Sequence, residues 1–234
     1  MKNFFNKTMD KKKALHLILI FILFYFSSLF QYIPIILLKI NIKTMSNECA
    51  ILLNLFSNLC MLTILFIIYR KALKKDFKNF TKNLYENLDI AIKYYLLGVL
   101  GMVITNLFIN IVLQGGGSNN EKIVQNMIGT MPYLMILIAG IIAPIIEEIV
   151  FRKTYLDACK NKYLYLFLSS FIFGIMHILT SDTTPTIIDI LYFIPYSCLG
   201  LSFAYMDYKQ KNIFPSICMH ILHNTLLIIL SIIS

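Results

Sequence analysis

The sequence predicts an all-α fold, a polytopic integral membrane bundle of about seven transmembrane helices. Of its 234 residues, 58% are hydrophobic and 14% are charged, whereas soluble domains average about 45–50% apolar and about 25% charged residues. Apolar runs of about 20 residues, the length that crosses a bilayer core as a helix, recur along the chain. This pattern excludes an ordinary soluble domain, a disordered tail and a collagen-like fibre.

Seven apolar runs are long enough to cross a membrane. They cover residues 14–38, 50–69, 91–113, 131–151, 163–180, 187–205 and 213–233. The first run follows Lys11, Lys12 and Lys13, as the apolar segment of a signal peptide would, but it is too long for one and no small-residue cleavage site follows it. We therefore expect this run to be retained as a membrane span.

The Lys and Arg residues give these spans an orientation. Of the 21 Lys and Arg residues, all but Lys39, Lys43 and Lys122 fall on one side of the predicted membrane. The positive-inside rule places that side, with the N-terminus, in the cytoplasm. The net charge of +9 therefore indicates topology and contact with anionic lipid, and we expect no nucleic-acid partner. The abundance of Ile, Asn, Lys and Phe, without Trp, is typical of an AT-rich bacterial genome and favours a bacterial plasma membrane.

We expect one integral membrane domain with two parts. Residues 1–130 would form an N-terminal cytoplasmic segment and three spans, and residues 131–234 a four-helix core. Between the second and third spans, the basic stretch 71–90 predicts either a short interfacial helix or a solvated loop. The Gly-rich stretch 115–120 predicts a flexible external loop.

Two adjacent carboxylates, Glu147 and Glu148, lie in the fourth apolar run. A charged side chain at membrane depth costs about 2.5–3.5 kcal/mol on insertion scales, which makes it a candidate functional residue. Glu148 and Arg152 are four residues apart, so they share a helix face and can pair. Glu147 points about 100° away from Glu148 and could act as a proton acceptor. A plain charge cluster at the cytoplasmic boundary is the alternative.

Two later runs carry histidines. His177 ends the segment Phe-Gly-Ile-Met-His in the fifth run. In the seventh run, His220 and Asn224 share a helix face, and His223 lies about 60° from His220. Each of these residues alone also fits helix packing or interhelical hydrogen bonding.

Together, these side chains indicate a hydrolytic site. All of them lie on the last four spans, and they supply a carboxylate base, imidazoles and an amide donor. This set suits general-base activation of water and stabilisation of an oxyanion. It does not suit a nucleophilic Ser or Cys, since none stands at a defined spacing to a histidine and an orienting acid.

Three motifs carry a resemblance to a known family. They are E-E-x-x-x-R (Glu147, Glu148, Arg152), F-x-x-x-H (Phe173, His177) and H-x-x-x-N (His220, Asn224), in this order on separate helices. They resemble the CAAX protease and bacteriocin-processing family of intramembrane endopeptidases, which includes the type II CAAX prenyl endopeptidase. The resemblance covers about residues 131–230, and residues 1–130 match only as unspecific membrane helices.

The resemblance implies a role for each motif residue. Glu147 would activate the attacking water together with His177. Glu148 and Arg152 would stabilise the helix and orient Glu147, and His220 with Asn224 would donate hydrogen bonds to the oxyanion. For Glu147 to meet His177, the fourth helix must continue past Phe151 or the fifth must begin outside the bilayer.

The sequence leaves the cofactor open. The family has been described both as metalloproteases and as metal-independent glutamate proteases. No H-E-x-x-H segment is present. Glu147, His177 and His220 could nevertheless bind a zinc ion, with water as the fourth ligand. A metal-free water is our expectation, and zinc is the alternative.

The sequence therefore predicts a cytoplasm-facing CAAX-type intramembrane protease. It would hydrolyse a bond near the C-terminus of a peptide or of a lipid-anchored protein, with the lipid bilayer as its other partner. A non-catalytic bacteriocin self-immunity or membrane scaffold protein of the same fold is the alternative. A transporter with a proton relay fits less well, because neither an inverted repeat nor a pair of Gly- or Pro-broken helices is evident. The substrate, the cut site and the oligomeric state stay open.

Overall fold

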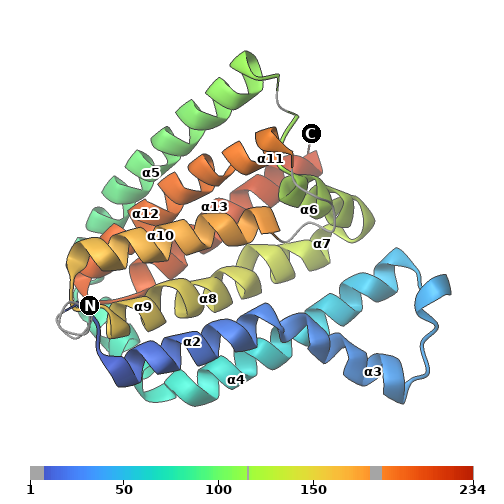
Figure 1. The fold of residues 1–234 in the computed structure, drawn as a ribbon, viewed down its shortest axis with the longest axis horizontal. Helices are drawn as coiled ribbons and strands as arrows, with labels where there is room; N and C mark the ends of the chain where they lie inside the picture. The colour runs from blue at the N-terminus through green and yellow to red at the C-terminus, as the bar shows by residue number, and fades with distance from the viewer. Residues whose placement is uncertain (1–7, 115, 180–185, 234) are drawn as a thin grey trace.

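A computed structural model describes residues 8–114, 116–179 and 186–233 (Figure 1). Within these residues, six helices are long and apolar enough to cross a membrane, and a bent helix pair makes seven if it counts as one span. The described residues form no sheet, and their one β-bridge joins Met9 to Cys159. The prediction of an all-α membrane bundle with about seven spans is confirmed.

The spans follow one another in chain order. They are the bent pair of α2 (Lys11–Tyr25) and Ser27–Leu37, which includes α3 (Tyr32–Leu37), then α4 (Asn47–Lys82), α5 (Leu84–Val112), the helix Pro132–Ala158, α10 (Lys162–Leu179), Ile187–Gln210 and α13 (Phe214–Ile233). Two of these spans have named parts. The helix Pro132–Ala158 is here called the glutamate helix and contains α7 (Pro132–Met135), α8 (Ala143–Glu148) and α9 (Thr154–Ala158). The span Ile187–Gln210 contains α11 (Ile187–Leu191) and α12 (Phe193–Gln210). Lys2, Lys7, Gly115 and Thr180, which belong to the predictions above, lie outside the described residues.

The first span is bent rather than continuous. Its two parts, Lys11–Tyr25 and Ser27–Leu37, meet at 46°. At the bend, the Ser27 hydroxyl donates to the Phe24 carbonyl over 2.7 Å, and the Ser27 carbonyl accepts from Ser57 of α4 over 2.6 Å. Serine side chains that bond to the backbone are a known cause of helix kinks. The hydropathy of the run carries no sign of this bend.

The basic stretch 71–90 is neither an interfacial helix nor a loop. The second span continues as helix α4 to Lys82, and α5 begins at Leu84. The turn between them is closed by Asn87, whose amide donates to the Phe80 carbonyl over 2.8 Å. The stretch is therefore the helical continuation of two spans, and both alternatives predicted from the sequence were wrong.

A further helix lies where only a loop was expected. Helix α6 spans Asn119–Thr130, and its first turn is capped by Ser118, which accepts from the Glu121 backbone N–H over 3.1 Å. Only residues 116–118 of the predicted Gly-rich loop are irregular among those described. Figure 1 shows α6 at one end of the bundle, beside the C-terminal end of α13.

One hydrophobic core joins the N-terminal helices to the motif-bearing helices. Its buried members include Leu65 of α4, Ile149 of the glutamate helix, Phe173 of α10, Ala204 of α12 and Ile217 of α13. Helix α5 packs mainly on α12 (Figure 1). The glutamate helix therefore lies inside the bundle, surrounded by other helices.

Most of the cations gather at one end of this bundle, here called the basic end. It consists of the start of α2, the C-terminal part of α4, α9, the start of α10 and the end of α12. A partly buried cluster joins α4, the glutamate helix and the residue that follows the turn after α12: the Lys153 ammonium lies 3.3 Å from both Asp76 and Asp157, and the Asn212 amide donates to the Asp76 carbonyl over 2.7 Å. Burial raises the pKa of the nearby Cys159 thiol to about 11, so this cysteine stays protonated at neutral pH.

Helices α10 and α12 approach each other at Gly174. A Cβ at this position would overlap the Ser197 hydroxyl and come within 3.0 Å of the Phe193 carbonyl. Only glycine permits this distance between the two backbones. The close approach sets the position of the neighbouring Phe173 and His177.

We expect Gly174→Ala to lower the free energy of unfolding by about 1–3 kcal/mol, because the added methyl group forces α10 and α12 apart. Gly129→Ala on α6 is the matched control, since nothing lies within 4 Å of its Cβ position. In the control, alanine should leave stability unchanged or raise it. Thermal unfolding in detergent measures both, and equal transition temperatures would contradict the close approach.

Candidate active site

The glutamates lie on an irregular part of the glutamate helix. Helix α8 (Ala143–Glu148) is flanked by two π-helical stretches, Ile136–Ile142 and Ile149–Lys153. Such stretches frequently occur at functional sites because they change the facing of side chains along a helix. The helix continues past Phe151 to Ala158, as the meeting of Glu147 and His177 requires.

Pro144 explains how α13 is joined to this helix. Proline has no backbone N–H, so it leaves a carbonyl of the preceding turn without its helical partner. Two side chains of α13 donate there: the Asn224 amide to the Ala139 carbonyl over 3.0 Å and the Thr225 hydroxyl to the Gly140 carbonyl over 3.3 Å. These bonds fix α13 against the glutamate helix one turn away from His220.

Glu148 is the centre of the buried polar network. Its side chain is fully buried and lies 3.2 Å from the Arg152 Nε, as the spacing of the two residues predicts. Its other oxygen lies 2.7 Å from His220 Nδ1. Because a carboxylate accepts, Nδ1 carries the proton and donates to it. Glu148 therefore contacts His220, and no contact shows it orienting Glu147.

Two aromatic rings enclose the Arg152 guanidinium. Its central carbon lies 4.4 Å from the centre of the Phe173 ring and 5.8 Å from the centre of the Phe203 ring. Phe203 also packs on the His220 ring, at 5.0 Å between ring centres. Cation–π contacts stabilise a desolvated guanidinium. Phe173 of the F-x-x-x-H motif thus packs on the cation that neutralises Glu148.

Glu147 differs from Glu148 in its surroundings. Its side chain is 18% exposed, and its Oε2 lies 3.7 Å from His220 Nε2. No described residue forms a hydrogen bond with this oxygen. The imidazole of His220 thus stands between the two adjacent glutamates, bonded to Glu148 and facing Glu147.

His177 enters the site from α10. Its Nδ1 donates to the Phe173 carbonyl over 2.9 Å, which leaves Nε2 as the acceptor in the neutral imidazole. Its ring stacks on Tyr196 of α12 at 4.4 Å between ring centres. Glu147 is near enough to interact electrostatically with His177. The structure thus brings Glu147, His177 and His220 to one place, around the Phe173 ring.

His223 has a different environment from His220. Its Nδ1 lies 3.2 Å from the Tyr95 hydroxyl of α5, and its side chain lines the same cavity as His220. Asn224 has one amide N–H engaged with the glutamate helix and lines the same cavity as His177 and His220. The spacing argument that grouped His220 with Asn224 therefore agrees with the structure.

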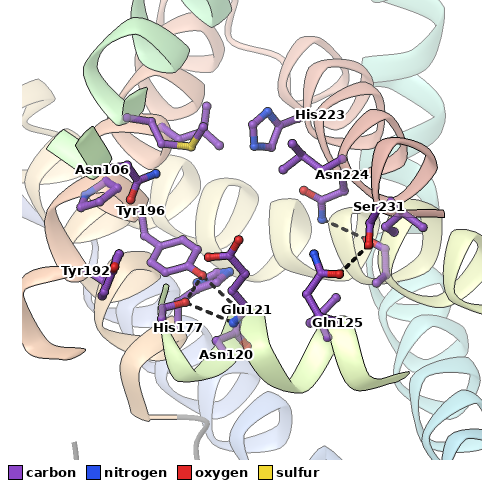
Figure 2. Close-up of a pocket in the computed structure, with 18 of the residues that line it drawn as sticks. Asn106, Asn120, Glu121, Gln125, His177, Tyr192, Tyr196, His223, Asn224 and Ser231 are labelled. Atoms are coloured by element: carbon purple, nitrogen blue, oxygen red, sulfur yellow. Dashed lines mark hydrogen bonds between the residues drawn. The ribbon is translucent and has the colours of Figure 1, made fainter. Parts of the chain in front are cut away.

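A cavity of about 540 Å³ lies beside these residues. Its inner wall includes Phe173, His177, His220 and Asn224, and its outer part includes Glu121 and Gln125 of α6. In Figure 2, the side chains of Glu121 and Gln125 project from α6 into the space between Tyr196 and Asn224. The candidate site is thus next to a space large enough for part of a peptide.

Two polar residues of this region were not predicted. Asp207 is fully buried at the end of α12 and accepts from the Ser216 hydroxyl over 2.6 Å and from the Ser216 backbone N–H over 3.2 Å. It thereby caps the first turn of α13, which carries His220. An acid directly after the sixth apolar run was the signal available in the sequence, since an acid that near the membrane interior is costly unless paired.

The side chains were also tested as a metal site. Among the described residues, no group of three or more His, Cys, Asp or Glu side chains is arranged to bind a metal ion. Glu147, His177 and His220 do not form such a group in this arrangement.

Comparison with known proteins confirms the resemblance for the motif-bearing part of the chain. Residues 129–226 match the family model described as type II CAAX prenyl endopeptidase Rce1-like. This segment carries all three motifs. No solved structure matches the chain significantly.

Three curated proteins are similar to this chain. The "Putative membrane peptidase YdiL" of Bacillus subtilis (strain 168) is 30% identical over 145 residues, which cover 61% of this chain and 49% of that protein. An uncharacterized protein of Mycoplasma capricolum subsp. capricolum is 30% identical over 62% of this chain and 46% of its own length. The UPF0177 protein YxdF of Lactococcus lactis subsp. lactis is 24% identical over 68% and 85%. The chain thus spans about half the length of the first two.

We expect Arg152→Met to lower the free energy of unfolding by about 3–5 kcal/mol, because it leaves the buried Glu148 carboxylate without its cation. The double variant Arg152→Met, Glu148→Gln should recover part of this loss. Lys93→Met removes the cation of an exposed helical ion pair with Asp89 and is the control, for which we expect little change. Thermal unfolding in detergent compares them; similar transition temperatures for Arg152→Met and Lys93→Met would refute the buried pair.

Proposed function

Since residues 129–226 match the CAAX prenyl endopeptidase-like family, we propose that this chain is an intramembrane endopeptidase in which Glu147 activates water for attack on a peptide bond. The coarser conclusion, a protease embedded in the membrane, follows from the family match and the apolar helices. The finer proposal rests on the surroundings of Glu147. Its side chain is partly exposed, and its Oε2 has no hydrogen-bond partner among the described residues. This oxygen faces the imidazole of His220, which the buried Glu148 carboxylate holds in place.

In the proposed reaction, Glu147 takes a proton from water as the water oxygen attacks the carbonyl carbon. His177 Nε2, the acceptor nitrogen of that ring, orients the water through its lone pair. Glu147 then gives the proton to the leaving nitrogen as the C–N bond breaks. The first products are a carboxylic acid, which keeps the second proton of the water, and an amine; the acid then loses that proton to the amine, which leaves a carboxylate and an ammonium group.

The oxyanion of the intermediate would be stabilised by His220 and Asn224. Because Nδ1 of His220 already donates to Glu148, Nε2 would donate to the oxyanion in the doubly protonated form of the ring. Asn224 retains a second amide N–H besides the one engaged with Ala139. Glu148 and Arg152 act here as positioning residues, because they reach the reaction only through His220.

The part 131–234 is the proposed catalytic core, and residues 1–130 complete its surroundings. The substrate would be a peptide or a membrane-anchored protein, and the bilayer is the environment of both. The family match and the YdiL similarity favour peptide hydrolysis over a non-catalytic immunity or scaffold role.

The test is cleavage of quenched peptides by detergent-purified protein, with Glu147→Gln and His177→Ala beside the unchanged chain. We expect both variants to lose about 100-fold or more in kcat/KM, the scale of a lost general base. Glu86→Gln changes an exposed carboxylate of α5 and is the matched control, with unchanged kcat/KM.

Cleavage that persists in Glu147→Gln would contradict the proposal. The same preparation answers the metal question when its metal content and activity are measured before and after chelation. We expect activity to survive chelation. Loss of activity that stoichiometric zinc restores would replace the metal-free water with the zinc alternative.

A further inference from the structure

The cavity has a closed inner end and an open outer end. At the inner end, Phe173 and His220 are 1% and 3% exposed. At the outer end, Glu121 and Gln125 of α6 and Leu230 of α13 are exposed. His177, His220 and Asn224 of the candidate site therefore form the inner wall of a pocket that is entered past α6, and Glu147 lies behind this wall, 3.7 Å from His220 Nε2.

This outer end is opposite to the basic end. Helix α10 begins at the basic end with Lys162 and places His177 15 residues later, about 22 Å along the helix axis. At the outer end, the Ser231 hydroxyl near the C-terminal end of α13 donates to Gln125 of α6 over 2.5 Å. Figure 1 shows α6 and the end of α13 on the side of the bundle away from α9.

Between the site and the basic end, the protein is tightly packed. Arg152 and Phe203 are completely buried, and so are Asp207 and Ser216 beneath them. None of these four residues lines the cavity. A peptide approaching from the basic end would have to separate the helices that carry the Glu148 network.

The charge of the cavity restricts what can enter it. Among the described residues that line it, the only permanently charged side chain is Glu121, and none is Lys or Arg. The other polar lining side chains are amides, hydroxyls and imidazoles, and they include Asn106, Gln125 and Tyr192. A free carboxyl terminus would meet no Lys or Arg side chain here and would be repelled by Glu121.

We propose that the site receives a neutral or cationic polypeptide segment from the non-cytoplasmic side of the membrane, through the cavity beneath α6. The side follows from the basic end, which the positive-inside rule assigns to the cytoplasm. The proposal deepens the proposed function and rests on it. It replaces two expectations from the sequence, that the site faces the cytoplasm and that the cut lies beside a free C-terminus.

The route is tested by thiol labelling in intact cells, which does not depend on hydrolysis. The five native cysteines are replaced, and a single cysteine is placed in the cavity wall by Asn106→Cys or, in a second variant, Met102→Cys. Lys74→Cys on the exposed face of α4 at the basic end is the matched control. We expect a membrane-impermeant methanethiosulfonate to modify the cavity cysteines in intact cells and the control only after permeabilisation.

The reverse pattern, or cavity cysteines that react from neither side in folded protein, would overturn the route.

The charge claim is tested by comparing a cationic with an anionic methanethiosulfonate, each normalised to its rate with free cysteine. We expect roughly a tenfold preference for the cationic reagent, the lower end of electrostatic focusing in a cleft, and a smaller one in Glu121→Gln. A preference for the anionic reagent would refute the charge claim. Loss of peptidase activity with this labelling pattern intact would refute only the proposed chemistry.

Discussion

The buried Glu148 carboxylate is the group on which the arrangement of this site depends. It lies between the Arg152 guanidinium on its own helix and the His220 imidazole of α13, 72 positions away in sequence. An isolated carboxylate in an apolar interior would be strongly unfavourable, so the helices that bring these partners must stay in place for it to remain ionised. The same contact fixes which nitrogen of His220 carries a proton and turns the other nitrogen toward Glu147. The contacts that hold these helices together are thus the same contacts that orient His220 toward Glu147.

The surrounding helices are shaped to protect that network. Near Pro144, whose ring leaves one backbone carbonyl without its helical partner, Asn224 and Thr225 of α13 donate to the carbonyls of Ala139 and Gly140. These bonds attach α13 to the glutamate helix one turn from His220. Gly174 lets α10 approach α12 closely, which brings Phe173 over Arg152 and His177 toward Glu147. Asp207 caps the first turn of α13 from the other end. The cost of burying two glutamates is offset by many contacts that only this set of helices provides.

The sequence predicted the spans well because their signal is local: a run of about 20 apolar residues has few alternatives to a membrane helix. It also identified the ionisable residues, since charge at membrane depth is rare. Prediction from the sequence failed where the local structure depends on a contact with a distant residue or on a feature that hydropathy does not record. The bend at Ser27 depends on a hydrogen bond from the serine hydroxyl to a backbone carbonyl. Helix α6 is an amphipathic helix that directly follows glycines. The stretch 71–90 is helical because α4 extends beyond its apolar run. The pairing of Glu148 with His220 has no local signature, and the family resemblance implied instead that Glu148 orients Glu147. The catalytic roles themselves remain predictions.

The proposed mechanism depends most directly on the proton of His220 Nδ1. Nitrogen NMR of the protein labelled with ¹⁵N-histidine distinguishes protonated from unprotonated ring nitrogens, and single substitutions of the four histidines assign the signals. We expect His220 to show a protonated, strongly hydrogen-bonded Nδ1 that shifts in Glu148→Gln and is unaffected by Glu86→Gln. A neutral His220 with its proton on Nε2 and a bare Nδ1 would contradict the bond to Glu148, and with it the geometry on which the proposed mechanism rests.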